Sequence, residues 1–372
     1  MPALSELTAC LNRLAPRRLA ESWDNVGLLL GDPAWPVERV MTCLTLTPDV
    51  AAEAISSGVQ LVVTHHPVMF KPVQKLTAEN AEGKMLLALA QARVAVYSPH
   101  TGYDSAPQGI NQQIAEALQL SEITPLRSLA AEPKYQIVVF VPRPDLEVVQ
   151  QAVWRAGAGQ IGEYAECSFY IPGTGTFRGS ATTHPTIGTP GQLEHVDEMR
   201  LEVLCQQNVL AEVIRELVKA HPYEEPAYFI YPLKVDSSSD GVGRYGNLPS
   251  SAAGQPITLA AFLEQVKAVL GVTRLQYTGQ LQQPVTRVGI ACGAGGEFLS
   301  DARRLKCDAF VTGEARFHGL LEARSQGIAL IVAGHFATEQ PAMRRLAQML
   351  SAEFPNLKVW LSHVETDPLM WA

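Results

Sequence analysis

Two adjacent histidines, His65 and His66, are the first residues of this chain whose types and spacing could do chemistry together. They directly follow the apolar run 61–64 and precede Pro67. Neighbouring side chains on a strand point to opposite faces, but at a strand's end the chain leaves the sheet, so both imidazoles could reach one cavity. A lone histidine is more often a hydrogen-bonded core or surface residue, whereas this pair makes metal binding an equal alternative.

Three further donors occupy comparable positions. Asp104 follows the apolar run 94–98, His335 follows the run 328–333, and Glu339 shares a face with His335 if a helix begins there. The carboxyl ends of strands in an open α/β sheet are where ligands bind. Although an aspartate after a strand is commonly a helix cap, three imidazoles and two carboxylates together form a mixed nitrogen and oxygen set that suits a metal.

Five ligands exceed the three or four that one zinc site takes from a protein. We therefore predict two divalent ions per subunit, bridged by carboxylate and roughly 3.5–4 Å apart. Zinc is the first expectation, and iron, manganese or cobalt also suit these donors. Such a pair would lower the pKa of bound water towards about 7 and so generate hydroxide at neutral pH. The expected chemistry is hydrolysis.

Residues near these donors are candidates for proton transfer. Glu314 and His318 occupy the place in the second half of the chain that His65 and His66 occupy in the first, and His100 corresponds to His335. Each could act as general acid or base or hold a ligand in place, and capping or structural hydrogen bonding is an equal alternative.

Two loops are weaker candidates. The glycine-rich run 289–296 follows a predicted strand and could cradle a phosphate on backbone amides, although it fits neither common phosphate-binding motif. Trp23 is expected to anchor a turn as a buried aromatic, with Asp24 a candidate contact near the site.

The elements that position these residues form two similar blocks. Short β-branched runs alternate with helical stretches over 4–120 and again over 258–361, which predicts two α/β lobes with mixed, mainly parallel sheets. The lobes repeat one another, since 24 positions separate Val40 from Thr64 and also Val288 from Thr312. This spacing favours a gene duplication and two pseudo-symmetric lobes.

The middle of the chain differs in pattern. Strand, helix, two extended runs, helix and strand follow one another there, which predicts an inserted ferredoxin-like α+β domain. Polar, loop-like joints at 121–133 and 235–246 flank it. We expect domains at 1–128, 129–238 and 239–372.

Composition restricts the class of protein. The 372 residues are 47% hydrophobic and 18% charged, which is typical of a globular chain, and the net charge of −8 makes nucleic acid an unlikely partner. No apolar run reaches the roughly 18 residues of a membrane span, and the start lacks a basic leader region, so we expect a cytoplasmic protein without a membrane partner. The six cysteines are far apart and are expected to be reduced and mostly buried.

The motifs, taken in order, resemble one known family, the Nif-three-like (NGG-one-interacting-factor-like) proteins, also known as GTP cyclohydrolase 1 type 2 homologues. The resemblance covers nearly the whole chain and lies in the motifs Trp23-Asp24-Asn25-Val26-Gly27-Leu28, Thr64-His65-His66-Pro67, His100-Thr101-x-x-Asp104, Gly109-Ile110-Asn111, Thr312-Gly313-Glu314 with His318, and Gly334-His335-x-x-x-Glu339.

The resemblance implies two α/β lobes with a dinuclear metal centre between them, in a homo-oligomer that is a ring-shaped hexamer in several members. Its implied metal ligands are His65, His66, Asp104, His335 and Glu339. The middle region is similar to the insert of longer members, which looks like the trimeric copper-tolerance (CutA) and PII proteins. Gly102 departs from the asparagine of many relatives, which leaves the ligand Asp104 in place but removes an amide that could contact substrate.

Two functions follow as hypotheses. The first is a dinuclear-metal hydrolase of a nucleotide-like small molecule, of GTP cyclohydrolase type by resemblance, with Glu314 or His318 assisting proton transfer. The alternative is a metal-binding scaffold or regulatory protein without turnover, whose PII-like insert binds partners or effectors.

Overall fold

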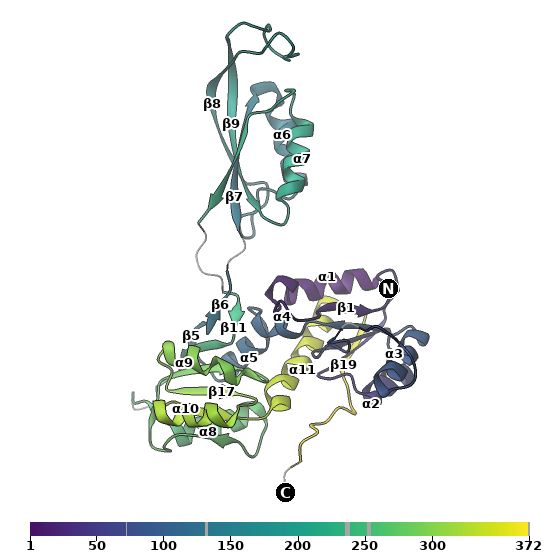
Figure 1. Ribbon diagram of the computed structural model, residues 1–372, viewed down its shortest axis with the longest axis vertical. Coiled ribbons are helices and arrows are strands. Elements are labelled where there is room, and N and C mark those ends of the chain that lie inside the picture. The colour runs from purple at the N-terminus through teal and green to yellow at the C-terminus, as the bar shows by residue number, and fades with distance from the viewer. Residues whose placement is uncertain (72, 131–132, 235–238, 251–253, 371–372) are drawn as a thin grey trace. The chain divides into compact units, whose positions relative to one another are not determined.

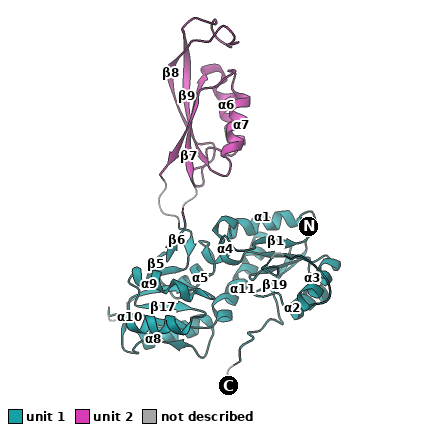
Figure 2. Ribbon diagram, in the orientation of Figure 1, with its two compact units in different colours: residues 1–129, 239–372 teal, residues 130–238 magenta. Residues whose placement is uncertain are grey.

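The computed structural model describes residues 1–71, 73–130, 133–234, 239–250 and 254–370. The chain forms two compact units, coloured separately in Figure 2. Unit 1 combines Met1–Leu129 with Ser239–Ala372, and unit 2 is Ala130–Ser238. Residues 131–132 and 235–238 of the predicted joints lie outside the described residues. None of the described helices is both long and apolar enough to cross a membrane.

The first sheet of unit 1 has the order β1-β4-β3-β2-β19. Its strands are β1 (Gly27–Leu30), β2 (Arg39–Cys43), β3 (Leu61–Thr64), β4 (Ala95–Ser98) and β19 (Lys358–Leu361). All neighbours pair in parallel except β1, which runs antiparallel to β4. Every residue of β3 and β4 is buried, as expected for parallel strands covered on both faces.

The second sheet has the order β14-β18-β17-β16-β12-β5. Its strands are β5 (Ser121–Thr124), β12 (Arg244–Asn247), β14 (Gln276–Tyr277), β16 (Arg287–Ala291), β17 (Ala309–Thr312) and β18 (Ala329–Val332). The three strands β16, β17 and β18 pair in parallel and β14 runs antiparallel to β18. An antiparallel edge strand followed by three parallel strands therefore occurs in both sheets.

Short antiparallel pairs and helices complete unit 1. The pairs are β6 (Arg127–Ser128) with β11 (Gly241–Val242), and β13 (Ile257–Thr258) with β15 (Pro284–Val285). The helices are α1 (Leu4–Leu14), α2 (Pro48–Ser56), α3 (Ala81–Gln91), α4 (His100–Ser105), α5 (Ile110–Ala117), α8 (Leu259–Leu270), α9 (Leu299–Arg304), α10 (Phe317–Gln326) and α11 (His335–Glu353), with 3-10 turns at Arg17–Leu19 and Gly295–Phe298.

The two segments of unit 1 exchange edge strands. β19, near the C-terminus, pairs with β2 in the first sheet, and β5, from the N-terminal segment, pairs with β12 in the second. Boundaries at 128 and 239 therefore do not separate the two sheets. The joints predicted as loops are also strands in part, because β5, β6, β11 and β12 take their hydrogen bonds from neighbouring strands rather than from water.

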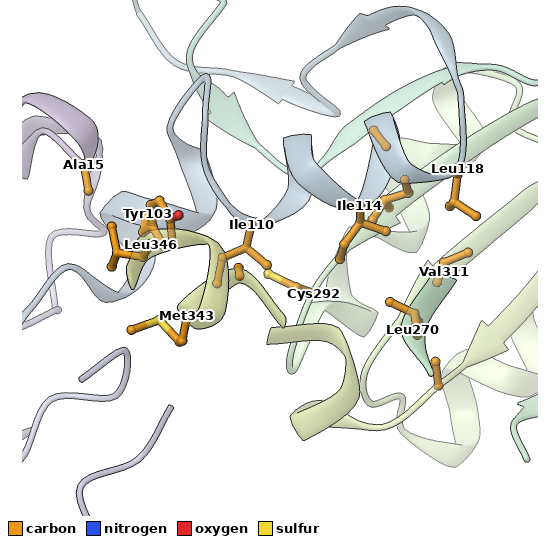
Figure 3. Packing of buried hydrophobic residues seen from close by; sticks show 14 of the residues in the cluster. Ala15, Tyr103, Ile110, Ile114, Leu118, Leu270, Cys292, Val311, Met343 and Leu346 are labelled. Carbon is orange, nitrogen blue, oxygen red and sulfur yellow. The ribbon is translucent and has the colours of Figure 1, made fainter. Parts of the chain in front are cut away.

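Helix α11 connects the two sheets (Figure 1). It packs on β2 and β19 of the first sheet and on α5 and α8 beside the second. Figure 3 shows Met343 and Leu346 of α11 next to Ile110 and Tyr103, all within one buried cluster that extends through both sheets. This shared core fixes the start of α11, and with it His335, relative to β3.

Unit 2 is a four-stranded antiparallel sheet with two helices. Its elements are β7 (Lys134–Pro142), a 3-10 turn (Arg143–Asp145), α6 (Leu146–Arg155), β8 (Ser168–Phe177), β9 (Glu194–Gln206), α7 (Leu210–Ala220) and β10 (Tyr228–Leu233). The sheet order is β10-β7-β9-β8, and the helices share one face of it (Figure 1). It has its own buried core, in which Val149 and Val153 of α6 meet Leu217 of α7.

Candidate metal site

The two adjacent histidines come together where β3 ends. Their backbone N–H groups donate to the carbonyl oxygens of Cys43 and Leu44, at 3.1 and 2.9 Å, so the chain follows the end of β2 for two residues beyond the strand. The ring centroids of His65 and His66 lie 5.2 Å apart. The His65 side chain is fully buried, whereas 27% of the His66 side chain is exposed. Both rings therefore reach the same side of the sheet edge.

Glu339 lies at the centre of the donor cluster. Its Oε2 atom is 3.0 Å from Nε2 of His66, 3.0 Å from Nε2 of His335 and 3.9 Å from Nε2 of His65. Helix α11 begins at His335, so Glu339 follows one turn later on the same face, as the spacing required. One carboxylate oxygen thus stands close to imidazoles from both segments of unit 1.

Asp104 completes the group of five predicted ligands. It lies on the short helix α4, and its Oδ1 is 3.5 Å from Nε2 of His65. The Asn111 side chain donates to the Asp104 backbone carbonyl at 3.0 Å, which holds the end of α4 in place. The structure therefore brings His65, His66, Asp104, His335 and Glu339 to one place, hereafter called the donor cluster.

The donor cluster fits a metal ion. Both ring nitrogens of buried His65 lack a hydrogen-bond partner within the described residues. Leaving a buried polar group without a partner costs about 1–3 kcal/mol, and a metal ion on a ring nitrogen would remove that cost. Two groups of residues each bring their ligand atoms within 4.8 Å of one another. One group is His65, His66 and His100, and the other is His66, His335 and Glu339.

The two partly exposed imidazoles of the cluster, His66 and His335, are each oriented through Nδ1, the ring nitrogen that does not face Glu339. Thr45 Oγ1 lies 2.7 Å from Nδ1 of His66, and Glu314 Oε1 lies 2.9 Å from Nδ1 of His335. Such contacts fix the tautomer and direction of imidazoles that bind metals. Glu314, a predicted proton-transfer residue, is therefore placed to orient His335.

His100 lies directly against the cluster. Its ring centroid is 5.2 Å from that of His65 and 5.7 Å from that of His66. Nδ1 of His100 contacts the fully buried carboxylate of Asp24 at 2.7 Å, which leaves Nε2 as its free ring nitrogen. The backbone of His100 has a φ of +30°, an uncommon conformation for a non-glycine residue that is frequent at functional sites.

His318 is not brought to the cluster. It lies exposed on α10, where its ring packs on Phe317 with centroids 6.0 Å apart. Within the described part of the chain, no contact joins it to the predicted ligands.

Burial and charge shift the titration of the cluster. Burial lowers the pKa of His65 well below its usual value, and burial together with nearby Glu339 raises the pKa of Asp104 to about 7. A hydrogen bond to Glu339 raises the pKa of His335 to about 9. Burial opposes ionisation of Glu339, but hydrogen bonds from His335 and His66 outweigh it and lower its pKa. In the absence of metal, the cluster therefore holds protons that a bound cation would replace.

Two amides of the glycine-rich run 289–296, the predicted phosphate cradle, already have side-chain partners. The backbone N–H groups of Cys292 and Gly293 already donate to the side chains of Asn111 and Thr338, at 2.8 and 3.0 Å. Gly293 has a φ of +56°, and a Cβ there would stand 1.9 Å from Oε1 of Glu339. The run thus provides space for the central carboxylate.

Two features of the site were not anticipated. Trp23 is 58% exposed, so the prediction of a buried aromatic anchor is wrong, and it is Asp24 beside it that is buried. Glu365, near the C-terminus, accepts hydrogen bonds from the backbone N–H groups of Leu44 and Thr45, at 2.9 and 2.6 Å. It thereby fixes the loop that carries the Thr45 contact to His66, although no sequence pattern linked it to the site.

A cavity of about 280 Å³ opens beside His66. Most of its lining side chains are apolar, among them Leu46, Pro48, Val68 and Met85. Thr45 and the exposed carboxylate of Glu82 also line it. This volume is just below the roughly 300–1,000 Å³ of typical small-molecule sites.

A family model described as Duf34/NIF3 (NGG1p interacting factor 3) matches residues 2–368. This chain belongs to the NIF3 family. Its similarity to curated members is 34% identity with a Halalkalibacterium halodurans protein over 96% of this chain and 95% of that one, and 32% with a Bacillus subtilis protein over 98% and 97%. Both relatives bear the name GTP cyclohydrolase 1 type 2 homolog.

Solved NIF3 relatives have the same fold. A Bacillus cereus protein related to NIF3 superposes with a TM-score of 0.83 at 32% identity, covering 100% of this chain and 99% of that one. A Staphylococcus aureus protein gives a TM-score of 0.80 at 27% identity, with the same coverage. The mixed α/β architecture predicted from the sequence is thereby confirmed.

Proposed function

We propose that this protein is a hydrolase that uses two divalent metal ions, with zinc as the first expectation, to act on a nucleotide-like small molecule. The observation that carries the proposal is the position of Glu339 Oε2, within 3.9 Å of Nε2 of His65, His66 and His335. The buried, unpartnered ring of His65 supports it further. Its proposed ligands are the donor cluster: His65, His66, Asp104, His335 and Glu339.

Bound there, divalent ions would lower the pKa of a water ligand and stabilise negative charge on a phosphoryl or carbonyl oxygen. The residues of the chain would do the rest. Thr45 and Glu314 hold the rings of His66 and His335 so that their Nε2 atoms face Glu339. Asp24 holds His100 by Nδ1, so Nε2 of His100 is our first candidate for donating a proton to the leaving group. Glu314, which contacts His335, is the alternative candidate for proton transfer, whereas exposed His318 lies away from the cluster.

The nucleotide-like substrate is proposed from two observations. Curated relatives that match almost the whole chain carry a GTP cyclohydrolase homologue name, and the cavity beside His66 has room for a small molecule. A ring-opening reaction on GTP is the specific form of this proposal.

The test is metal content and turnover of the purified protein. Mass spectrometry should find close to two divalent ions per chain in the wild type and a large loss in a His66→Ala/Asp104→Ala variant, together with loss of activity on a panel of nucleotides. His195→Ala, which removes an exposed imidazole from β9, should keep both. Turnover by the metal-free double variant would refute the proposal.

The second candidate is a metal-binding scaffold or regulator without turnover. We interpret unit 2 as the inserted ferredoxin-like domain of PII/CutA type, because its strand order β10-β7-β9-β8 and paired helices are those expected of that fold. It contains none of the five proposed ligands. A chain in which a short linker replaces residues 133–236 should keep its metal and activity if the protein is an enzyme, whereas a scaffold would show no turnover in either form and would lose partner or effector binding.

A further inference from the structure

Two large aromatic side chains are exposed together beside the donor cluster. Trp23 is 58% exposed and Phe70 is 49% exposed, yet their ring centroids are only 5.7 Å apart. Isolated exposed apolar residues are normal on protein surfaces, whereas contiguous ones mark sites of interaction. We call Trp23 and Phe70 the aromatic pair.

The aromatic pair is held by contacts on both of its loops. The Asn25 side chain, two residues after Trp23, donates to the carbonyl of Met69, the residue before Phe70, at 2.6 Å. Asp24, the neighbour of Trp23, binds Nδ1 of His100 and the hydroxyl of Thr101. Two loops from different parts of the first lobe are therefore fixed to each other and to the start of α4.

The pair is also continuous with the imidazoles of the site. The rings of Trp23 and Phe70 approach His100 edge to face, with centroids 6.3 and 6.4 Å away. His100 in turn contacts His65 and His66. One imidazole therefore separates an exposed aromatic surface from the proposed metal ligands, so a single small molecule could contact both.

We propose that Trp23 and Phe70 bind the planar heteroaromatic ring of the substrate, specifically the base of a purine nucleotide, while its phosphates reach the donor cluster. Stacking is the interaction that exposed aromatic side chains offer to a base, and it needs no burial of the pair before the ligand arrives. The acidic and imidazole side chains of the cluster would attract phosphates only through bound cations. This proposal rests on the proposed function and adds how the substrate is selected.

The experiment measures binding to the zinc-loaded full-length protein by isothermal titration calorimetry. The probes are GTP, ATP and inorganic triphosphate, which has the phosphates but no ring. Wild-type protein should bind both nucleotides more tightly than triphosphate. The Trp23→Ala/Phe70→Ala variant should bind the nucleotides roughly 5- to 100-fold more weakly, as expected for loss of base stacking, and should bind triphosphate as wild type does.

Two further variants separate the ring contact from general effects. The single variant Trp23→Phe should keep most of the wild-type nucleotide affinity, because it keeps an aromatic face at position 23. Phe229→Ala removes a side chain that is 50% exposed in unit 2 and should change neither affinity. Metal content, measured on every variant, should equal that of the wild type.

Equal affinity of wild type for triphosphate and the nucleotides would overturn the proposal, as would unchanged nucleotide affinity in the double variant. A double variant whose sedimentation mass changes while its nucleotide affinity does not would show that the pair covers a contact between copies of the chain, and this also overturns the proposal. Ring-dependent binding without any turnover would support it while refuting the proposed hydrolase.

Discussion

Replacing Gly293 by alanine should remove metal from the donor cluster without unfolding the protein. The added Cβ would stand 1.9 Å from Oε1 and 3.0 Å from Cδ of Glu339, and 3.2 Å from Nε2 of His335. Real Cβ atoms do not approach so closely, so the Glu339 carboxylate must move away from the imidazoles. The left-handed φ of +56° adds a backbone strain of about 1–2 kcal/mol for any residue with a Cβ.

These two effects can be measured separately. Gly271, after α8, has a φ of +67° and nothing within 4 Å of an added Cβ, so Gly271→Ala carries the strain without the collision. Both variants should unfold about 1–2 kcal/mol more easily in urea. Only Gly293→Ala should lower the zinc affinity. The loss should be at least roughly 10- to 100-fold, which is the usual effect of removing a contact that orients a metal ligand. Wild-type zinc affinity in Gly293→Ala would show that Glu339 is not held where metal binding requires it.

Three other outcomes are expected. Glu314→Ala should weaken zinc binding about 10- to 100-fold in a competition assay, because His335 loses the carboxylate at its Nδ1; unchanged affinity would mean that the contact does not orient the ring. Arg244→Met should destabilise unit 1 by roughly 3 kcal/mol or more in urea unfolding, since the buried guanidinium donates to the backbone carbonyls of Gly241, Gly243 and Ala106. A loss below about 1 kcal/mol would contradict this. The pKa of His335 is raised to about 9 and that of Asp104 to about 7, so the metal-free folded protein binds these protons more tightly than the unfolded chain does. The free energy of unfolding should therefore fall as pH rises, from about 4 to 7 because of Asp104 and from about 6.5 to 9 because of His335. Because zinc replaces those protons, the rise in melting temperature on adding zinc should grow between pH 6 and pH 8, and a decline over that range would be inconsistent with these shifts.

The part of the site that depends on local rules was predictable. The alternation of strands and helices placed His65, His66 and Asp104 at the carboxyl ends of strands, and the four-residue spacing of His335 and Glu339 required only that a helix begin at His335, which it does. Periodicity carries such information because it reflects which face of an element is buried.

The rest depends on contacts between distant segments. Trp23 is a large apolar residue, which usually indicates burial, but here it is exposed beside His100. The polar joints resemble loops in composition, yet β5 and β12 find partners in a sheet formed mostly by residues beyond 280. The role of Gly293 becomes visible only when Glu339 is seen against it. Local sequence patterns do not predict which distant segments of the backbone will pack against each other.

The exchange of edge strands has a consequence for synthesis on the ribosome. His66 and Glu339 are 273 residues apart in the chain, and β19, which completes the sheet carrying His66, follows later still. At translation rates of roughly 5–20 residues per second, the two histidines after β3 emerge about 14–55 s before their carboxylate partner. A nascent chain must therefore keep an incomplete first sheet through the whole translation of unit 2. Premature termination before residue 339 would leave these imidazoles without Glu339, so the proposed metal site would be complete only after nearly all of the polypeptide has been made.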